Sequence, residues 1–529
     1  MKKRILALTI GIVMLAGTLL GCGGNGDTTT ETNGETTQEA NGGDEATGTG
    51  EELVVLDVFI NHVWYREDEF VGIIPELVKE ATGVDLNVTI ATDPQQLGVM
   101  IASGDLPDLI FTSEEVDRLS NSNLTISYTE LEENYGASFA EVAPERVAIA
   151  RNLSQDGDFY TILNHFSTPD ELANLQVGAA GQPAIFYRRD LLEAVGIDGQ
   201  SITSVEALMD ALEIVRDEYE DMVPFGLGGW WKFQGLGNAV GIEAARFNPD
   251  TGEYSYVATT PEYRELLEIA NRMYREGFIT AEQYANENEG DSDQAAFNNQ
   301  VVFHNAFLSY TDFAHLQAET RNLHPDAVWG VLPFLGDGWT GYGRGWSGVF
   351  VSRNVSDPYA AARLLTFLHS DEGRRASIWG REGIDFTLDE HGVPQFSEQF
   401  KEARSAGQLS EVFNWRFNFG STLVEEIYLL FSGIDPELLE VFSTYGVNAR
   451  TFPEVGISQP TAASSEGVIR ERLEELRRVH DAKIIFTSSD EEFEEAYQEY
   501  MDALIQTGVL EYNEYMTNAI RETRENLGW

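Results

Sequence analysis

The chain has 529 residues, of which 42% are hydrophobic and 11% aromatic, so it is too apolar for a disordered protein and too long for one hydrophobic core. Its 88 Asp and Glu outnumber 34 Lys and Arg, and the formal net charge of −54 excludes nucleic acid as a partner. The acids are spread along the chain, a pattern typical of a halophilic adaptation, in which concentrated salt screens the self-repulsion of an acidic surface. An ordinary acidic bacterial surface is the alternative.

The first 50 residues are predicted to be an export signal and a tether. Three basic residues precede the apolar run Ile5 to Leu20, which is too short to span a bilayer and is placed like the core of a signal peptide. The run ends in LLGC, which resembles the bacterial lipobox. Residues 1–21 are therefore predicted to be removed, and Cys22, the only cysteine, to be lipidated on the outer side of the cytoplasmic membrane. Residues 22–50 contain no aliphatic side chain larger than alanine and are predicted to be a disordered tether.

The body of the chain begins with alternating strands and helices. The apolar run Leu53 to Ile60 predicts a buried strand, and Gly72 to Gly83 predicts a helix with an early proline and a terminal glycine. A second strand at Val84 to Ile90, a helix at Pro94 to Ser103 and a third strand at Leu109 to Phe111 complete a βαβαβ unit. Such a unit predicts a parallel sheet whose ligand chemistry lies at the carboxyl ends of the strands.

Six segments resemble one protein family. The segment Ile101 to Ile110, IASGDLPDLI, is similar to the SGdlPDi signature of family 1 extracellular solute-binding proteins, the receptors of ABC sugar importers, and in particular of a subgroup of long oligosaccharide-binding lipoproteins. Further similar segments follow in the family's order: DGDFY (156–160), FYRRDLLEAVGI (186–197), SDPYAAARLLTFLHSDEG (356–373), WGREGIDF (379–386) and FTSSDEEFEEAYQEYMDAL (486–504). The resemblance extends from about Leu53 to Asn526.

The resemblance implies an α/β fold of the type II periplasmic-binding class, with two lobes, an interlobe ligand cleft and hinge segments that cross between the lobes. We place the crossings near Leu163, Val331 and Ser356. This assigns residues 51–163 and 331–356 to lobe 1, and residues 164–330 and 357–529 to lobe 2.

Tryptophans are the first candidates for a saccharide site, because aromatic plates cover the flat C–H faces of sugar rings. Trp64 directly follows the first strand, Trp230 and Trp231 follow a glycine-rich bend, Trp346 lies near a predicted crossing, and Trp379 lies in the WGREG segment. Packing in the core is the alternative for each.

Polar candidates stand at strand ends or crossings, where they would hydrogen-bond sugar hydroxyls. They are Asn61, His62, Thr112, Glu114, Asn164, His165, Asn305, Tyr342, Arg344, Glu382 and Asp385, and the aromatic Phe307 accompanies Asn305 after a strand-like QVVF. A structural or solvent-exposed role is the alternative, above all for the carboxylates.

The chain lacks the motifs of common enzymes. Val349 stands where the G-x-S-x-G elbow needs its last glycine, and the sequence has no Walker A, HExxH or CxxC motif. The acidic residues 289–293 do not follow EF-hand spacing and are predicted to be a solvated loop. We therefore expect no catalysis, no cofactor and no metal.

Together these features predict a lipid-anchored, monomeric receptor that closes two lobes around an oligosaccharide and delivers it to the transmembrane subunits of an ABC permease. The alternatives are a receptor for a peptide or another polar solute, a sensor that signals without transport, and an envelope enzyme that degrades polysaccharides.

Overall fold

The structure is a computed structural model. It describes residues 53–65, 67–168, 171, 183–229, 232–286, 289–341, 343–414, 418–431, 434, 436–446, 448–461 and 464–528. The predicted signal peptide, Cys22 and the predicted tether lie outside the described residues. Everything below concerns the compact unit Glu51–Trp529. Within its described part, no helix is both long and apolar enough to cross a membrane.

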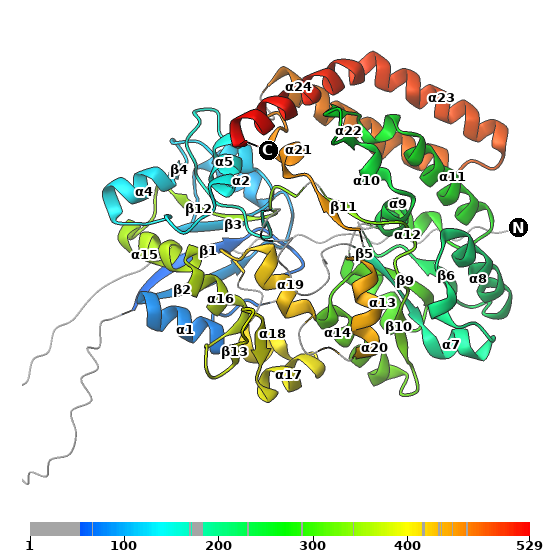
Figure 1. The fold of residues 1–529 in the computed structure, drawn as a ribbon, viewed down its shortest axis with the longest axis horizontal. Coiled ribbons are helices and arrows are strands. Elements are labelled where there is room, and N and C mark those ends of the chain that lie inside the picture. The colour runs from blue at the N-terminus through cyan, green and yellow to red at the C-terminus, as the bar shows by residue number, and fades with distance from the viewer. Residues whose placement is uncertain are drawn as a thin grey trace, which may run out of the picture. The chain divides into compact units, whose positions relative to one another are not determined.

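Sheet A is the five-stranded sheet that the start of the chain builds (Figure 1). Its strands, in spatial order, are β2 (Val84–Ile90), β1 (Val54–Ile60), β3 (Leu109–Thr112), β12 (Gly348–Ser352) and β4 (Thr125–Ile126). Strand β1 runs parallel to β2 and β3, and β12 runs antiparallel to β3. The connecting helices are α1 (Ile73–Thr82) and α2 (Gln96–Ser103). The predicted βαβαβ unit is thus confirmed, with boundaries within two residues.

Sheet B is a separate four-stranded sheet from the middle of the chain. Its order is β10 (Trp329–Val331), β5 (Pro183–Arg188), β9 (Val301–Phe307) and β6 (Val223–Gly226). Strand β9 runs parallel to β6 and antiparallel to β5. The chain thus leaves sheet A after β4, forms sheet B, and returns to sheet A at β12.

The helices that follow β12 pack on sheet A. Helices α15 (Pro358–His369) and α16 (Asp371–Trp379) place Leu364 and Ile378, both fully buried, in the same core as Val58 of β1. Along α19 (Leu423–Phe431), Leu429 belongs to the core of sheet A and Ile427 to a core beside sheet B. The apolar face of α15 does not by itself reveal which sheet it covers, and the crossing near Ser356 stays a prediction.

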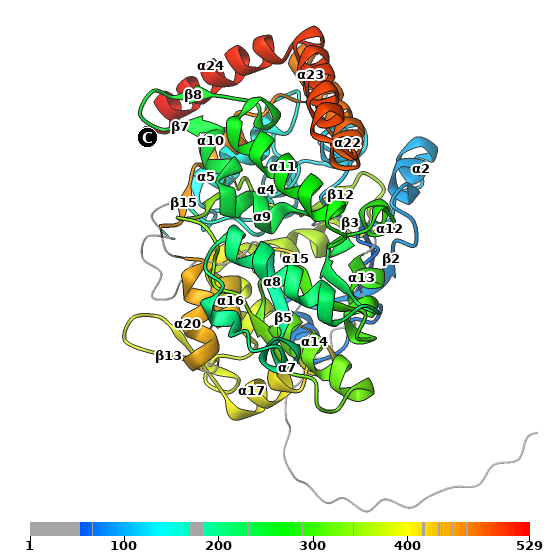
Figure 2. The same ribbon diagram turned by 90° about the vertical axis from the view of Figure 1, so that its right-hand side faces the viewer.

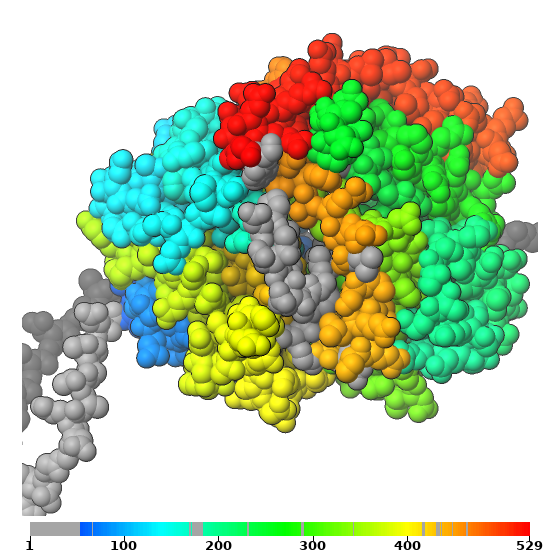
Figure 3. Space-filling view, in the orientation of Figure 1, coloured from blue at the N-terminus to red at the C-terminus, as the bar shows by residue number. Residues whose placement is uncertain are grey.

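The C-terminal helices belong to the side of sheet B. They are α22 (Ser465–Ile485), α23 (Asp490–Thr507) and α24 (Val509–Leu527), which form the upper edge of the molecule in Figure 3. They share a core with α11 (Pro261–Arg275) through fully buried Leu473, Tyr500 and Met516. Figure 2 shows the hairpin β7–β8 (Phe247–Asn248 and Glu253–Tyr254) beside α24, where the backbone N–H of Tyr254 donates to Thr517 Oγ1 at 3.0 Å.

The remaining helices and short strands surround sheets A and B. The helices are α3 (Val116–Leu119), α4 (Tyr128–Tyr135), α5 (Pro144–Asn152), α7 (Arg189–Ala194), α8 (Val205–Glu218), α9 (Gln234–Val240), α10 (Ile242–Ala245), α12 (Ala281–Ala285), α13 (Glu289–Phe297), α14 (Tyr310–Leu323), α17 (Glu398–Ser405), α18 (Leu409–Phe413), α20 (Pro436–Thr444) and α21 (Pro453–Ile457), with 3₁₀ turns at Gly199–Ser201 and Val257–Thr259. The short strands are β11 (Thr340–Gly341), β13 (Phe386–Leu388), β14 (Pro394–Phe396) and β15 (Arg450–Thr451).

Candidate functional site

The pairing of sheet A brings three predicted segments to one edge. Ile60 of β1 pairs with Phe111 of β3, so the residues that follow these parallel strands leave the sheet side by side. Strand β12 is antiparallel and its first residue, Gly348, pairs with Thr112, so the residues that precede β12 arrive at the same edge. Residues 61–64, 112–114 and 346–347 are therefore neighbours, as expected for the carboxyl ends of parallel strands.

Three rings at this edge form a stack that we call the aromatic platform: His62, Trp64 and Trp346. The centroid of His62 lies 4.6 Å from that of Trp346 and 5.4 Å from that of Trp64, and the two indoles are 5.7 Å apart at an interplanar angle of 29°. Phe111 meets Trp346 edge-on at 6.0 Å. Trp64 is 39% exposed and Trp346 is partly buried, so the platform offers aromatic surface to solvent.

The platform carries no charge at neutral pH. His62 is buried, and its Nε2 lies 2.9 Å from Ser347 Oγ. Burial lowers the pKa of His62 to about 4, because desolvation disfavours the imidazolium form. The imidazole is therefore neutral and exchanges a hydrogen bond with a hydroxyl, an environment suited to an uncharged sugar face.

Buried polar groups form the floor beneath the platform. Asn61 Nδ2 donates to Thr112 Oγ1 at 3.2 Å, and that hydroxyl also donates to Glu114 O at 3.0 Å. Asn61 Oδ1 is buried and has no hydrogen-bond partner within the described ranges. The Glu114 residue itself is exposed. Thr112 thus supports the loop that follows β3. The Oδ1 atom of Asn61 remains an acceptor without a described partner.

Asn164 joins three segments that are distant in the sequence, at what we call the crossing junction. Its backbone N–H donates to Ser347 O at 2.8 Å, its Oδ1 accepts from Ser347 N at 3.0 Å, and its carbonyl accepts from Trp346 N at 3.0 Å. Its Nδ2 donates to Asn418 O at 2.8 Å, just before α19. Leu163, near which a crossing is predicted, directly precedes Asn164. The fully buried Asn164 therefore binds these three segments to one another.

Arg146 and His165 strengthen the same junction. Arg146 is 3% exposed, and its Nη2 donates to the carbonyls of Leu163, Gly420 and Ser421 at 2.8, 3.4 and 3.3 Å. His165 adopts a left-handed backbone (φ 55°), and its Nδ1 bonds Glu426 of α19. Burial opposes the charged form of His165, but the Glu426 carboxylate outweighs burial and raises the pKa of the imidazole. His165 thus links the segment after Leu163 to α19.

The edge of sheet B holds the other predicted polar segment. Asn305 of β9 is buried, and its Nδ2 donates to Lys232 O at 3.1 Å. Gly228 has φ 66°, and a Cβ there would lie 1.8 Å from Asn305 O, so only glycine fits this bend. Phe307 ends β9 half-buried and pairs with Pro183. Trp230, Trp231 and Tyr342 lie outside the described residues.

The WGREG segment makes buried structural contacts. Trp379 is 2% exposed, its Nε1 donates to Glu425 O at 2.9 Å, and Phe386 packs edge-on against it at 5.2 Å. Asp385 is fully buried and accepts from Arg381 Nε at 2.7 Å. Glu382 is exposed at the turn before β13. Trp379 and Asp385 thus help to fix α16 and the turn before β13. A ligand contact of Trp379, Glu382 or Asp385 stays a prediction.

Some important residues carried no signal in the sequence. Ser347 is a small polar residue beside a tryptophan, and Arg146 lies in a helix whose pattern predicts an exposed charge. Only the pairing of distant segments shows that both are buried. Residues 289–293, predicted as a loop, form the first turns of α13, and Asp293 Oδ1 lies 3.0 Å from buried His304 Nε2. No group of metal-ligating side chains gathers within the described part.

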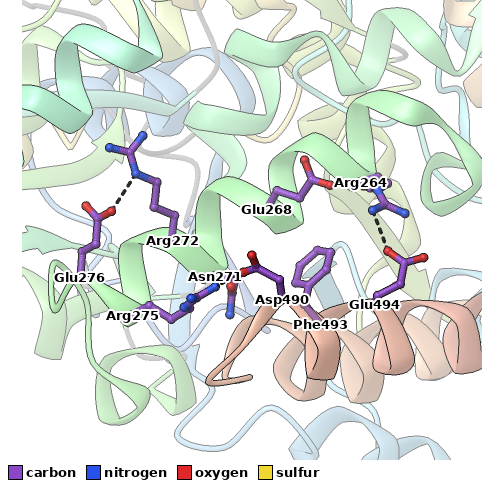
Figure 4. Close-up of a pocket in the computed structure, with 9 residues that line it drawn as sticks. All are labelled: Arg264, Glu268, Asn271, Arg272, Arg275, Glu276, Asp490, Phe493 and Glu494. Carbon is purple, nitrogen blue, oxygen red and sulfur yellow. Dashed lines mark hydrogen bonds and ion pairs between the residues drawn. The ribbon is translucent and has the colours of Figure 1, made fainter.

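A cavity of about 650 Å³, which we call the charged groove, lies between α11 and α23 (Figure 4). Three arginines line it, and each bonds a carboxylate: Arg264 Nη2 lies 2.8 Å from Glu494, Arg272 Nε lies 2.9 Å from Glu276, and Arg275 Nη1 lies 2.5 Å from Asp490. Arg264 and Arg275 thus join α11 to α23, and Arg272 bonds the residue that caps its own helix.

Comparison with known proteins identifies the fold. No family model and no curated protein matches the sequence. The solved structures that match include the alginate-binding protein AlgQ2 without calcium ion (16% identity, 90% of this chain and 100% of that chain, TM-score 0.64) and the Streptococcus pneumoniae ABC-transporter substrate-binding protein FusA in complex with kestose (15%, 89% and 100%, 0.61). A solute-binding protein from Bifidobacterium longum infantis described as binding HMO also matches (12%, 89% and 99%, 0.57). The chain therefore has the two-lobed α/β fold of solute-binding proteins, and the predicted fold class is confirmed.

Proposed function

We propose that this protein is the extracellular receptor of an ABC importer and that it captures a saccharide, an oligosaccharide in particular, by closing its two lobes. The observation that carries the proposal is the aromatic platform beside the crossing junction. His62, Trp64 and Trp346 provide neutral, stacked surface beside this junction. Solved structures of the same fold include proteins titled as binding alginate and kestose.

Such a site can supply much of the free energy that saccharide binding requires. Micromolar binding needs about 8 kcal/mol net. Apolar burial on two indoles and several hydrogen bonds, each worth about 1 kcal/mol net, can supply a large part of it. The ligand must contact both lobes, because only a higher affinity for the closed state shifts the population toward closure. Asn61 Oδ1 on one side and the residues after β6 and β9 on the other are suited to these contacts.

The platform favours a saccharide over a peptide. A peptide receptor needs charged side chains that bind the charged peptide termini. The three side chains of the platform are neutral at physiological pH. An enzyme that cleaves glycosidic bonds uses two facing carboxylates, and the strand ends described above present only Glu114. We therefore rank both alternatives below the saccharide receptor.

Isothermal calorimetry against a broad panel of plant and microbial oligosaccharides tests the function. Trp64→Ala and Trp346→Ala should each weaken the best ligand at least about tenfold, while Tyr359→Ala, which removes a 56% exposed aromatic from α15, should leave affinity unchanged. Absence of binding across the panel, or hydrolysis of a polysaccharide by the purified protein, would contradict the proposal.

The lipid anchor and the permease are further parts of this proposal. Cys22→Ser should release the protein from membranes into the soluble fraction, and wild type should remain in the membrane fraction until detergent is added. Sedimentation of the released protein should show a monomer. Retention of the serine variant on membranes would contradict a lipid anchor at Cys22.

A further inference from the structure

The segment directly before β12 is fixed by hydrogen bonds to Asn164. Within it, Arg344 and Trp346 are partly buried and Ser347 is fully buried. Asn164 N donates to Ser347 O at 2.8 Å, and Ser347 N donates to Asn164 Oδ1 at 3.0 Å. Trp346 N donates to Asn164 O at 3.0 Å. Two successive residues before β12 are therefore held by one buried asparagine.

Two glycines bring the backbone on both sides of Ser347 against the segment that precedes Asn164. A Cβ at Gly345, where φ is 96°, would lie 2.5 Å from Leu163 Cβ. A Cβ at Gly348 would lie 2.1 Å from Thr161 Oγ1. Because a side chain fits at neither place, the backbone can approach this closely only with glycine. The hydroxyl of Ser347 therefore projects from a backbone whose position is fixed.

The hydroxyl of Ser347 bonds the buried ring of the aromatic platform. Ser347 Oγ lies 2.9 Å from His62 Nε2, and His62 is 6% exposed. The His62 ring contacts both indoles, with centroid distances of 4.6 Å to Trp346 and 5.4 Å to Trp64 and interplanar angles of 29° and 31°. A hydrogen bond at Nε2 orients the imidazole, and so it also fixes the surface against which the two indoles pack.

We propose that Ser347 is a positioning residue of the saccharide site: its hydroxyl orients the His62 imidazole, and the imidazole sets the angle and spacing of the two indoles. This inference rests on the proposed function. Ser347 is fully buried and acts through His62 on the rings that the sugar contacts. A ring that is already held in its binding orientation loses less conformational freedom when a saccharide stacks on it, so positioning increases affinity.

The first test is optical and needs no ligand. The indoles of Trp64 and Trp346 lie 5.7 Å apart, so they should give an exciton couplet in circular dichroism, isolated as the difference between wild type and Trp64→Phe. Ser347→Ala, made with and without Trp64→Phe, should lose at least about half of the couplet amplitude, because the coupling depends on the spacing and angle of the two rings. A couplet of unchanged amplitude would overturn the proposal.

Calorimetry on the full chain then connects ring position to binding, with cellotetraose, maltotetraose, mannotetraose and kestose as probes. Ser347→Ala should weaken the tightest of these ligands at least about threefold, the effect of one modest hydrogen bond. His62→Phe keeps an aromatic ring but has no nitrogen to bond the hydroxyl. In that background the same substitution should change affinity less than about 1.5-fold, as a double-mutant cycle requires of two residues that act together. An effect of equal size in both backgrounds would overturn the action through His62.

Ser352→Ala is the matched control. Ser352 lies at the other end of β12, is fully buried, and its hydroxyl accepts from Asn354 N at 3.1 Å. Its removal should leave the couplet and the affinity unchanged, and unfolding midpoints show that each variant folds. A loss of affinity in Ser352→Ala equal to that in Ser347→Ala would indicate a general effect of stability and overturn the proposal. Failure of every saccharide to bind wild type would overturn the proposed function, whereas the couplet decides the role of Ser347 independently.

Discussion

The aromatic platform and the charged groove differ in whether their polar side chains already have hydrogen-bond partners. The groove has a large volume, but each of its arginines already bonds a carboxylate. The platform combines an exposed and a partly buried indole, a neutral imidazole and an acceptor that has no partner among the described residues. The comparison teaches that unused hydrogen-bonding capacity beside aromatic surface indicates a ligand site better than empty volume does.

The largest expected difference between the two regions is in stability. Arg146→Met at the crossing junction removes three hydrogen bonds to buried carbonyls and should lower the free energy of unfolding by about 3 to 4 kcal/mol. Arg264→Met in the groove breaks exposed ion pairs and should cost about 1 kcal/mol or less. Urea unfolding measures both. Equal losses would show that the junction is no more important to the fold than the groove.

A second expected difference is the pH dependence contributed by His62. Its folded pKa of about 4 lies below the unfolded value of 6.5, so the unfolded state binds the proton first as the pH falls. The stabilising contribution of neutral His62 to the free energy of unfolding is present above pH 6.5 and is lost progressively toward pH 4. Between pH 7 and pH 5, wild type should lose about 2 kcal/mol more than His62→Gln. Parallel curves for the two proteins would show that His62 is not buried in neutral form.

A third difference concerns binding, where only the platform should matter. Trp346→Ala should reduce saccharide affinity at least about tenfold, about 1.4 kcal/mol, since it removes a stacking surface. Arg272→Met in the charged groove should change affinity less than twofold, because its side chain is engaged with Glu276. Calorimetry with one saccharide measures both variants. A loss of binding in Arg272→Met would indicate that the saccharide binds in the charged groove.

The smallest expected effect is that of salt. With 88 acidic and 34 basic residues, screening should relieve self-repulsion, so the thermal midpoint should rise by a few degrees between 0.1 and 2 M NaCl. The exposed ion pairs of the groove weaken in the same range, which keeps the net rise small. A midpoint that falls with NaCl would contradict a surface adapted to concentrated salt.

The sequence predicts well what depends on local pattern. The strands and helices from Leu53 to Phe111 lie within two residues of their predicted bounds, because alternating apolar runs and terminal glycines act locally. The parallel order of these strands then places Asn61, His62, Trp64 and Thr112 at one edge.

What the sequence does not contain is the choice between alternative packing partners. Trp346 and Trp379 both adjoin glycines, yet one borders the platform and the other fills a core beside Glu425. The same ambiguity applies to α15, because its leucines suit either sheet by pattern and only the structure shows that they lie in the core of sheet A. Only the contacts between distant segments settle these cases.

A crystal structure grown with the tightest-binding oligosaccharide tests the central claim most directly. The account predicts a sugar ring stacked on Trp64 or Trp346, with hydrogen bonds from residues that follow strands of both sheets. A saccharide bound in the charged groove, or one that touches a single lobe, would contradict capture between two lobes.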